Sequence, residues 1–421
     1  MVRHGLVVLL VMAMSVFTAA APIEIEFHFV ANQSEADAWY TLTDMFNASQ
    51  DEIVVVPYWD TGEWIGYQER MLVRIAAATP PHIMRLSDEA LPVWADAGYL
   101  RPLDDWLERD IDLSDYLPIT AQLGSHRGVF YGFPQGLATR ALAYNRLMFV
   151  NAGLSYPSDD WRWDQELLDA ARRLSTRDAD DLPLTYGIGF HTGGAGNLRK
   201  DIPEILWAFG GEVFDAEGNM RLGDDESIEA LSFIQSLVYE YRVFPEDFDV
   251  VGRFLNGTLA MWNTGVWDVN LLRQTDTLDF DFAPTPGGPA GHFSFIQGNG
   301  VYVIPAVVDD EKAAAAWEFM KFLVSAEAQR VFGLEYGIGG VPLVTSLVPE
   351  YVAQPSPPDS WDAFVTSVQR GRMVYHPPNA DEIFNALNVG WGEMIRGETP
   401  VRTWFDAVAP VVRTILERAQ Q

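Results

Sequence analysis

The strand, helix and second strand at the start of the chain place the strongest limit on its fold. Apolar residues alternate with polar ones over 23–29, which predicts a strand with one buried face. A helical stripe of apolar side chains follows over 35–46, and 53–56 is an entirely apolar strand. Two strands joined through a helix pair in parallel, because such a long crossover does not form a hairpin. The sequence therefore predicts an α/β fold with a parallel sheet.

The same alternation continues along the chain. Glycine and proline punctuate 128–136, which we interpret as a crossing between two lobes, and the Pro/Gly loop at 284–291 is the second expected crossing. The other elements expected from apolar periodicity are strands at 82–88, 139–145 and 185–190, and helices at 67–78, 89–97, 164–174, 199–209, 225–241, 313–324, 326–332, 380–395 and 401–418.

The length of 421 residues exceeds what one hydrophobic core usually supports, so two domains are expected. We expect an N-terminal lobe made of 22–131 and 284–340, and a C-terminal lobe made of 132–283 and 341–421. Residues 1–21 have the basic start, apolar run and small-residue end of a secretory signal peptide. The apolar run is too short to span a bilayer comfortably. The mature protein is therefore expected in a periplasm or outside the cell.

Charge and cysteine content exclude several classes of function. The formal net charge of −31 comes from 59 acidic against 28 basic residues, so nucleic acid and anionic membrane surfaces are unfavourable partners. We interpret the acidity as a solvated surface. The absence of cysteine excludes disulfides, thiolate metal sites, thiol nucleophiles and a thioether lipid anchor. The seven histidines show no metal-ligand spacing, so neither a metal nor a cofactor is expected.

Four stretches together resemble the family 1 extracellular solute-binding proteins of ABC importers, which include maltose-, trehalose- and glycerol-phosphate-binding proteins. They are MLVRIAAATPPHIMRLSDEALPVWADAGYLRPLDDWL, FLNGTLAMWNTGVWDV, FAPTPGGPAGHFSFIQGNGVYVIP and AAAAWEFMKFLVSAEAQ. They occur in the family's order, and the resemblance spans 23 to about 415. The stretch Thr79–His82 departs from the Gly-x-x-Pro-Asp that the family often has there.

The resemblance implies a type II periplasmic binding protein fold, in which two hinged α/β lobes close on a ligand. It implies a receptor without catalytic activity that captures a mono- or oligosaccharide and delivers it to the membrane permease of an ABC importer. We expect the receptor to be a monomer.

Candidate ligand-binding residues come from strand ends, glycine-rich turns and the resemblance. Open α/β sheets bind ligands at the carboxyl ends of their strands, which selects Asn32, Gln33 and Glu35 after the first strand and Ser87 and Asp88 after the third. Glycine permits close backbone approach, which selects Gln297, Gly298 and Asn299. The resemblance adds Thr139, Arg140, Tyr144, Trp262, Gly265, Trp267, Arg372 and Tyr375. Of these, Trp262 is expected as a stacking platform for a sugar ring, with a helix beginning near Gly265 that points free N–H groups at ligand oxygens.

Competing interpretations remain open at this point. Trp262 and Trp267 are alternatively core residues, and Glu35 and Asp88 alternatively serve helix ends. Within the same class, Arg140 and Arg372 can supply donors for glycerol phosphate or another organophosphate. A different class, a secreted glycoside hydrolase, would use Glu35 and Asp88 as its two carboxylates. The roles of Trp59 and Trp64 are not assigned.

Overall fold

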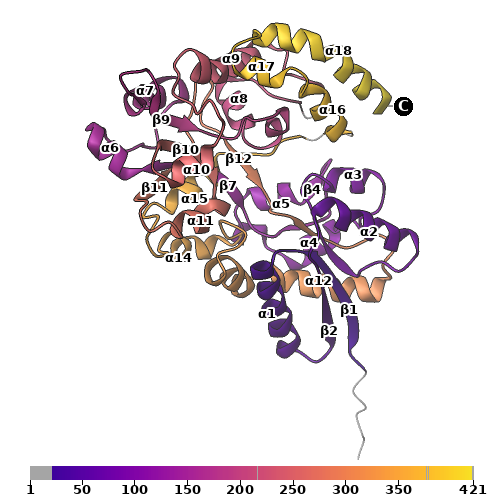
Figure 1. The fold of residues 1–421 in the computed structure, drawn as a ribbon. Helices are drawn as coiled ribbons and strands as arrows, with labels where there is room; N and C mark the ends of the chain where they lie inside the picture. The colour runs from indigo at the N-terminus through magenta and orange to yellow at the C-terminus, as the bar shows by residue number, and fades with distance from the viewer. Residues whose placement is uncertain (1–20, 216, 376, 378, 420–421) are drawn as a thin grey trace, which may run out of the picture.

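The computed structural model describes residues 21–215, 217–375, 377 and 379–419 (Figure 1). The expected signal segment lies outside these residues, apart from Ala21. Within the described residues the strands form two large sheets and one two-stranded hairpin, and each large sheet is covered by helices of its own. The predicted α/β class with two lobes is therefore confirmed. We call the sheet that contains the N-terminal strand the first sheet and the other the second sheet, and each lobe takes the number of its sheet.

The first sheet has the strand order β2-β1-β3-β13-β6. Its strands are β1 (Ile23–Val30), β2 (Ile53–Asp60), β3 (Ile83–Leu86), β6 (Gly132–Pro134) and β13 (Val301–Val303). Strand β1 pairs in parallel with both β2 and β3, so the predicted βαβ unit is confirmed. The helices of this lobe are α1 (Gln33–Ser49), α2 (Trp64–Ala76), α3 (Leu91–Asp96), α4 (Asp104–Asp110), α5 (Ile119–Leu123), α12 (Asp310–Leu323) and α13 (Ala326–Gln329). A short hairpin of β4 (Ser125–His126) and β5 (Val129–Phe130) lies beside α5.

The second sheet has the strand order β14-β12-β7-β10-β9-β8, with β11 also paired to β7. Its strands are β7 (Ala138–Asn145), β8 (Thr176–Arg177), β9 (Pro183–Gly189), β10 (Leu259–Gly265), β11 (Phe280–Ala283), β12 (Ser294–Gln297) and β14 (Gly371–Arg372). Its helices are α6 (Arg146–Ala152), α7 (Leu168–Leu174), α8 (Pro203–Phe209), α9 (Asp225–Tyr239), α10 (Val250–Leu255), α11 (Val269–Arg273), α14 (Val348–Val352), α15 (Asp362–Gln369), α16 (Ala380–Leu387), α17 (Trp391–Ile395) and α18 (Val401–Ala419).

The strand pairings locate where the chain passes between the sheets. Strand β6 belongs to the first sheet and β7 to the second, so the first crossing is 135–137. The loop at 284–291 was expected to be the second crossing, and this expectation is wrong, because β11 and β12 on either side of it both pair with β7. Composition marks a Pro/Gly loop but does not say which strands it joins. The second crossing is 298–300, between β12 and β13.

The crossings are hydrogen-bonded to one another. The amide of Gln135 donates to the carbonyls of Gly298 (3.0 Å) and Gly300 (2.9 Å). Leu137 exchanges two backbone hydrogen bonds with Val341, at 2.9 and 3.0 Å, which adds a third segment to this hinge. We propose that these segments, rather than the boundaries expected from composition, separate the two lobes.

A core of aromatic rings fixes α1 and α12 on β1. Phe27 contacts Trp39 and Phe319 edge to face, with ring centroids 5.7 and 5.4 Å apart. All three side chains are fully buried. Truncating such a ring to alanine costs about 3–5 kcal/mol, so this contact is a main source of the first lobe's stability.

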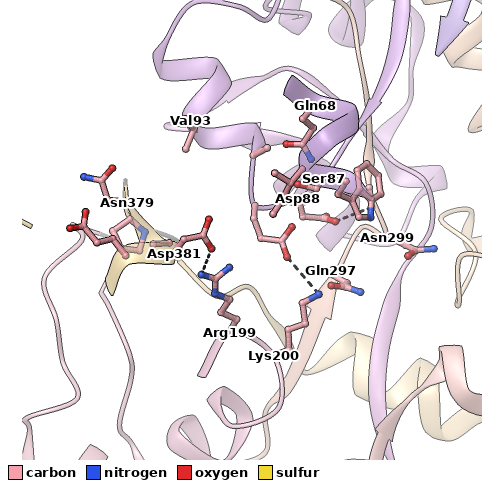
Figure 2. A pocket seen from close by; sticks show the side chains of 18 residues that line it. Gln68, Ser87, Asp88, Val93, Arg199, Lys200, Gln297, Asn299, Asn379 and Asp381 are labelled. Carbon is pink, nitrogen blue, oxygen red and sulfur yellow. Dashed lines mark hydrogen bonds and ion pairs between the residues drawn. The ribbon is translucent and has the colours of Figure 1, made fainter. Parts of the chain in front are cut away.

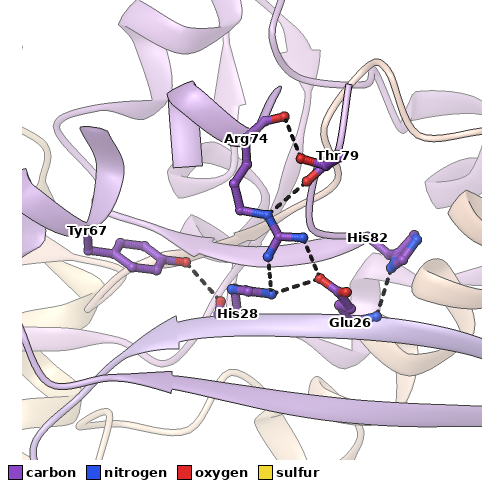
Figure 3. A network of polar contacts seen from close by, with 6 residues as sticks. All are labelled: Glu26, His28, Tyr67, Arg74, Thr79 and His82. Atoms are coloured by element: carbon purple, nitrogen blue, oxygen red, sulfur yellow. Dashed lines mark hydrogen bonds and ion pairs between the residues drawn. The ribbon is translucent and has the colours of Figure 1, made fainter. Parts of the chain in front are cut away.

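A polar network fastens α2 to the strands beneath it (Figure 3). Arg74 donates to the carboxylate of Glu26 (2.7 Å) and to the carbonyl of Thr79 (2.8 Å). Its Nη1 lies 2.8 Å from Nε2 of His28, and His82 Nδ1 accepts from the amide of Glu26. Burial and the neighbouring Arg74 lower the pKa of His28, although Glu26 opposes the shift. The network holds the outer side of the lobe together and supplies none of the residues that line the cleft described next.

Candidate ligand-binding cleft

Three adjoining cavities lie between the lobes, and together we call them the cleft. The central cavity, of about 680 Å³, is lined by Trp64, Ser87 and Asp88 from the first lobe and by Lys200 and Asp381 from the second (Figure 2). The distal cavity, of about 740 Å³, extends towards His126, Arg127, Phe295, Arg372 and Tyr375. The hinge cavity, of about 230 Å³, is lined by Asn32, Glu35, Trp267, Asn299 and Tyr336. Asp88 and Gln297 line both the central and distal cavities, and Asn299 joins the central to the hinge cavity.

The strand-end residues of the first lobe reach the cleft and also cap a helix. Asn32 is the N-cap of α1, and its side chain accepts from the amide of Glu35 at 3.0 Å. The carboxylate of Glu35 accepts in turn from the amide of Asn32, which completes a capping box. Both residues line the hinge cavity, so the two interpretations coexist. Gln33 is exposed and donates to Asp37, and it lines none of the three cavities.

Asp88 fastens the second crossing to the end of β3. Its Oδ1 accepts from the amide of Gly298 at 2.6 Å, and its Oδ2 accepts from the amide of Gly300 at 2.9 Å. Burial, together with Glu89, raises the pKa of Asp88 to about 6 in spite of these two hydrogen bonds. The residue between the two glycines, Asn299, has a φ of 53° and lines the cleft. Asp88 therefore fixes the backbone that presents Asn299.

Trp64 is a cleft residue that sequence reasoning left unassigned. Its ring lines the central cavity, and the guanidinium carbon of the buried Arg85 lies 4.9 Å from its centroid. Arg85 also donates to the carbonyl of Asn299 at 2.9 Å. Because Trp64 begins α2 directly after β2, the strand-end rule that selected Asn32 and Ser87 would have selected it too.

The two tryptophans of the sequence TLAMWNTGVWD have different roles. Trp262 is fully buried in the middle of β10, against Phe254, and lines none of the cavities. The expectation that Trp262 is a stacking platform is therefore wrong, because both faces of its strand are covered. Trp267 is 43% exposed and lines the hinge cavity. Gly265 is buried and precedes a short 3₁₀ turn, and a Cβ there would lie 2.2 Å from the ring of Trp267, so glycine makes room for the indole.

Three residues of β7 that the resemblance selected do not line the cavities. Thr139 is buried and donates to the carbonyl of Phe295 at 2.8 Å. Tyr144 lies at the far end of the strand, where its hydroxyl donates to Asp281 at 3.4 Å. Arg140 is 3% exposed and forms an ion pair with Asp201 at 2.8 Å. These expectations of direct contact are not met in this structure, because each of the three side chains is engaged by neighbouring residues within the second lobe.

Of the remaining expected residues, all but Gly298 line the cleft. Gln297, Asn299, Arg372 and Tyr375 line it, as does Ser87. Gly298 lines none of the cavities, and a Cβ there would lie 2.6 Å from Cβ of Pro134, so the crossing requires glycine. Sequence reasoning missed Lys200 and Asp381, because these residues reach the cleft only through the tertiary fold.

The cationic side chains of the cleft are paired with carboxylates. Within the described residues, the four lysines and arginines that line the cavities each have an acidic partner within 4 Å. The pairs are Arg199–Asp381 at 2.5 Å, Lys200–Glu89 at 3.8 Å, Arg127–Asp96 at 3.3 Å and Arg372–Glu212 at 3.0 Å. The cleft therefore offers hydrogen-bonding groups and aromatic faces with little unbalanced positive charge.

The described part of the chain has neither a metal-binding cluster nor a membrane-spanning helix. No group of three or more histidine and acidic residues is arranged to hold a metal ion there. None of the helices in those residues is long and apolar enough to cross a membrane.

Comparisons with known proteins agree with this architecture. The maltotriose-binding protein of Pyrococcus abyssi is 23% identical over 286 residues, which are 67% of this chain and 58% of that protein. The chain thus matches less than two thirds of the length of this curated relative. Among solved structures, the cyclic α-maltosyl-1,6-maltose binding protein of Arthrobacter globiformis has a TM-score of 0.80 at 21% identity, covering 94% of this chain and 100% of that one. UgpB of Mycobacterium tuberculosis, in complex with glycerophosphocholine, has a TM-score of 0.76 at 20% identity, covering 96% and 100%.

These structural likenesses confirm the two-lobe fold of the periplasmic binding proteins. The family model described as bacterial extracellular solute-binding protein matches residues 32–330, which include most of both sheets and the first two crossings. The chain belongs to the bacterial extracellular solute-binding protein family.

Proposed function

We propose that this protein is the extracytoplasmic receptor of an ABC importer, which captures a carbohydrate in the cleft and delivers it to the membrane permease. One observation carries the proposal: the cleft joins aromatic rings to hydrogen-bonding groups from both lobes, around a hinge. A sugar presents C–H groups on its ring face and hydroxyls around its edge, which suit tryptophan and polar side chains respectively. The name of the Pyrococcus relative, which specifies maltotriose, supports the same class.

The charge pairing of the cleft favours a neutral ligand over an organophosphate. A phosphate needs cationic or N–H donors that are not already occupied. Arg140 is buried away from the cavities, and Arg372 donates to Glu212 at 3.0 Å. A dianion bound to Arg372 would therefore lie beside the carboxylate of Glu212, which repels it, whereas a neutral sugar hydroxyl can add to the existing pair. Glycerol phosphate and related ligands remain the second candidate, supported by the glycerophosphocholine complex of UgpB.

The residues suggested for a glycoside hydrolase are committed to other partners. Both oxygens of Asp88 accept backbone amides, and Glu35 takes part in the capping box of α1. This supports a receptor without catalytic chemistry. Release of chromophore from a chromogenic glycoside, lost in Glu35→Gln, would contradict it.

Calorimetry against a panel of mono- and oligosaccharides tests the proposed function. We expect saturable heat for at least one sugar, together with a smaller radius of gyration in solution scattering when that sugar is present. A flat titration with every sugar, and an unchanged scattering curve, would refute the carbohydrate assignment. We further propose that the protein acts as a monomer in the periplasm or outside the cell, which sedimentation and cell fractionation would test.

A further inference from the structure

A buried arginine lies behind the cleft wall of the second lobe. Arg140 pairs with Gly265 in the register of β7 and β10, at the end of the strand that faces the hinge. Only 3% of its surface is exposed, and it is absent from the linings of all three cavities. Its influence on a ligand must therefore pass through neighbouring residues.

The guanidinium contacts one lining residue of each cavity. Its Nε donates to the carbonyl of Lys200 at 3.1 Å, and Lys200 lines the central cavity. Its carbon lies 5.1 Å from the ring centroid of Trp267, which lines the hinge cavity. It also lies 5.8 Å from the ring of Phe295, which lines the distal cavity. The interaction between a planar cation and an aromatic ring is favourable when water is excluded. These contacts tie three separate parts of the cleft wall to the guanidinium of Arg140.

A buried carboxylate pairs with the guanidinium, and two further acidic groups feel its charge. Asp201 pairs with its Nη2 at 2.8 Å and is itself buried. Burial raises the pKa of both Glu204 and Asp268, and the charge of Arg140 opposes each shift. Glu204 accepts from the amide of Phe295 at 3.1 Å, so Phe295 is fixed from a second side. An isolated buried charge is unfavourable, so the guanidinium needs these acidic neighbours. The single cation of Arg140 therefore interacts both with several acidic groups and with several residues of the cleft wall.

We propose that Arg140 is a positioning residue that sets ligand specificity in all three cavities by fixing Lys200, Trp267 and Phe295 together. This inference rests on the proposed binding function of the cleft. Lysine cannot replace arginine here, because an ammonium group has neither the planar face that lies on two rings nor a donor on its stem at the position of Nε.

The test compares Arg140→Lys with a matched control, Arg146→Lys. Arg146 begins α6 at the opposite end of β7 and pairs with Asp281 at 2.7 Å, so it is likewise an ion-paired arginine, with 20% of its side chain exposed. With the sugar that the panel identifies, we expect Arg140→Lys to weaken binding about tenfold or more, and Arg146→Lys to change affinity by less than about twofold. Equal affinities in Arg140→Lys and the parent protein, or equal losses in the two variants, would overturn the proposal.

A double-mutant cycle separates positioning from general loss of structure. If Arg140 acts partly through Trp267, the effects of Arg140→Lys and Trp267→Phe on affinity are not additive. If the two effects on affinity are additive, Arg140 does not act through Trp267. If Arg140→Lys does not fold, Asp201→Asn removes the same Nη2 pair. We expect Asp201→Asn to weaken binding about threefold or more, and an unchanged affinity would overturn the proposal.

A readout without ligand distinguishes failure of this inference from failure of the proposed function. Acrylamide quenching of tryptophan emission and hydrogen exchange of the segment around Lys200 both report on the wall itself. We expect Arg140→Lys, but not Arg146→Lys, to increase both. If no sugar binds the parent protein, the carbohydrate assignment fails, whereas unchanged quenching and exchange in Arg140→Lys refute the positioning role.

Discussion

Nζ of Lys200 lies 3.8 Å from Oε1 of Glu89, and this ion pair joins the second lobe to the first across the central cavity (Figure 2). Both side chains are partly exposed, so the pair is worth no more than about 1 kcal/mol. We expect Lys200→Met to enlarge the radius of gyration of the unliganded protein slightly and to change sugar affinity by no more than about fivefold. Raising the salt concentration should reproduce the change in the parent protein and have little effect in the variant. Identical scattering curves at low salt would show that the pair does not hold the lobes.

The two tryptophans of TLAMWNTGVWD provide a matched pair of substitutions. Trp267 is exposed in the hinge cavity, so Trp267→Ala should weaken sugar binding by about tenfold with little loss of stability. Trp262 is sealed in the core, so Trp262→Ala should lower the free energy of unfolding by about 3–5 kcal/mol. Calorimetry and denaturant unfolding on both variants check this. A loss of affinity in folded Trp262→Phe larger than that in Trp267→Ala would reverse the assignment.

Pairing of the cleft cations predicts weak competition by phosphate compounds. Inorganic phosphate and glycerol 3-phosphate should leave the sugar isotherm unchanged in the parent protein, since Arg372 is engaged by Glu212. Glu212→Gln removes that partner and should allow phosphate to compete. Tight binding of glycerol 3-phosphate to the parent protein would instead establish the second candidate function.

Glu204 predicts a pH dependence of stability with a definite sign. Burial raises the pKa of its carboxyl from 4.5 to about 7. Because the folded state keeps the proton to higher pH than the unfolded state, this contribution to stability is fully present below pH 4.5 and is lost as the pH rises through about 7. The free energy of unfolding of the parent protein should therefore fall relative to that of Glu204→Gln, by up to about 3 kcal/mol across this interval. Urea unfolding at several pH values measures both curves, and parallel curves would contradict the raised pKa.

Local sequence pattern predicts the helices and strands of this fold better than it predicts which strands pair with each other. The alternation over 23–29 and the helical stripe over 35–46 correspond to β1 and α1, because a strand and an amphipathic helix each impose a period on buried residues. The loop at 284–291 has the composition of a crossing but returns to the same sheet. Which strand a loop leads to depends on pairing with distant residues, and no local pattern contains that information.

The candidate site likewise contains residues that local pattern predicts and residues that only the tertiary fold brings together. Asn32, Ser87 and Asp88 lie at the cleft because the ends of parallel strands meet at one edge of a sheet. Trp262 is selected by the family resemblance, and neither that resemblance nor local periodicity reveals that both faces of β10 are covered. Lys200 and Asp381 come from segments far apart in the chain, and only the folded second lobe brings them to the cleft.

The backbone hydrogen bonds that Gln135 donates to Gly298 and Gly300 make two of the three connecting segments bend as one unit. Much of the cavity lining, by contrast, comes from loops and helix starts outside that unit, such as those bearing Trp64, Trp267 and Tyr375. On the proposed function, substitutions in those loops can thus alter which ligand the cleft recognises while the pivot and its motion stay the same.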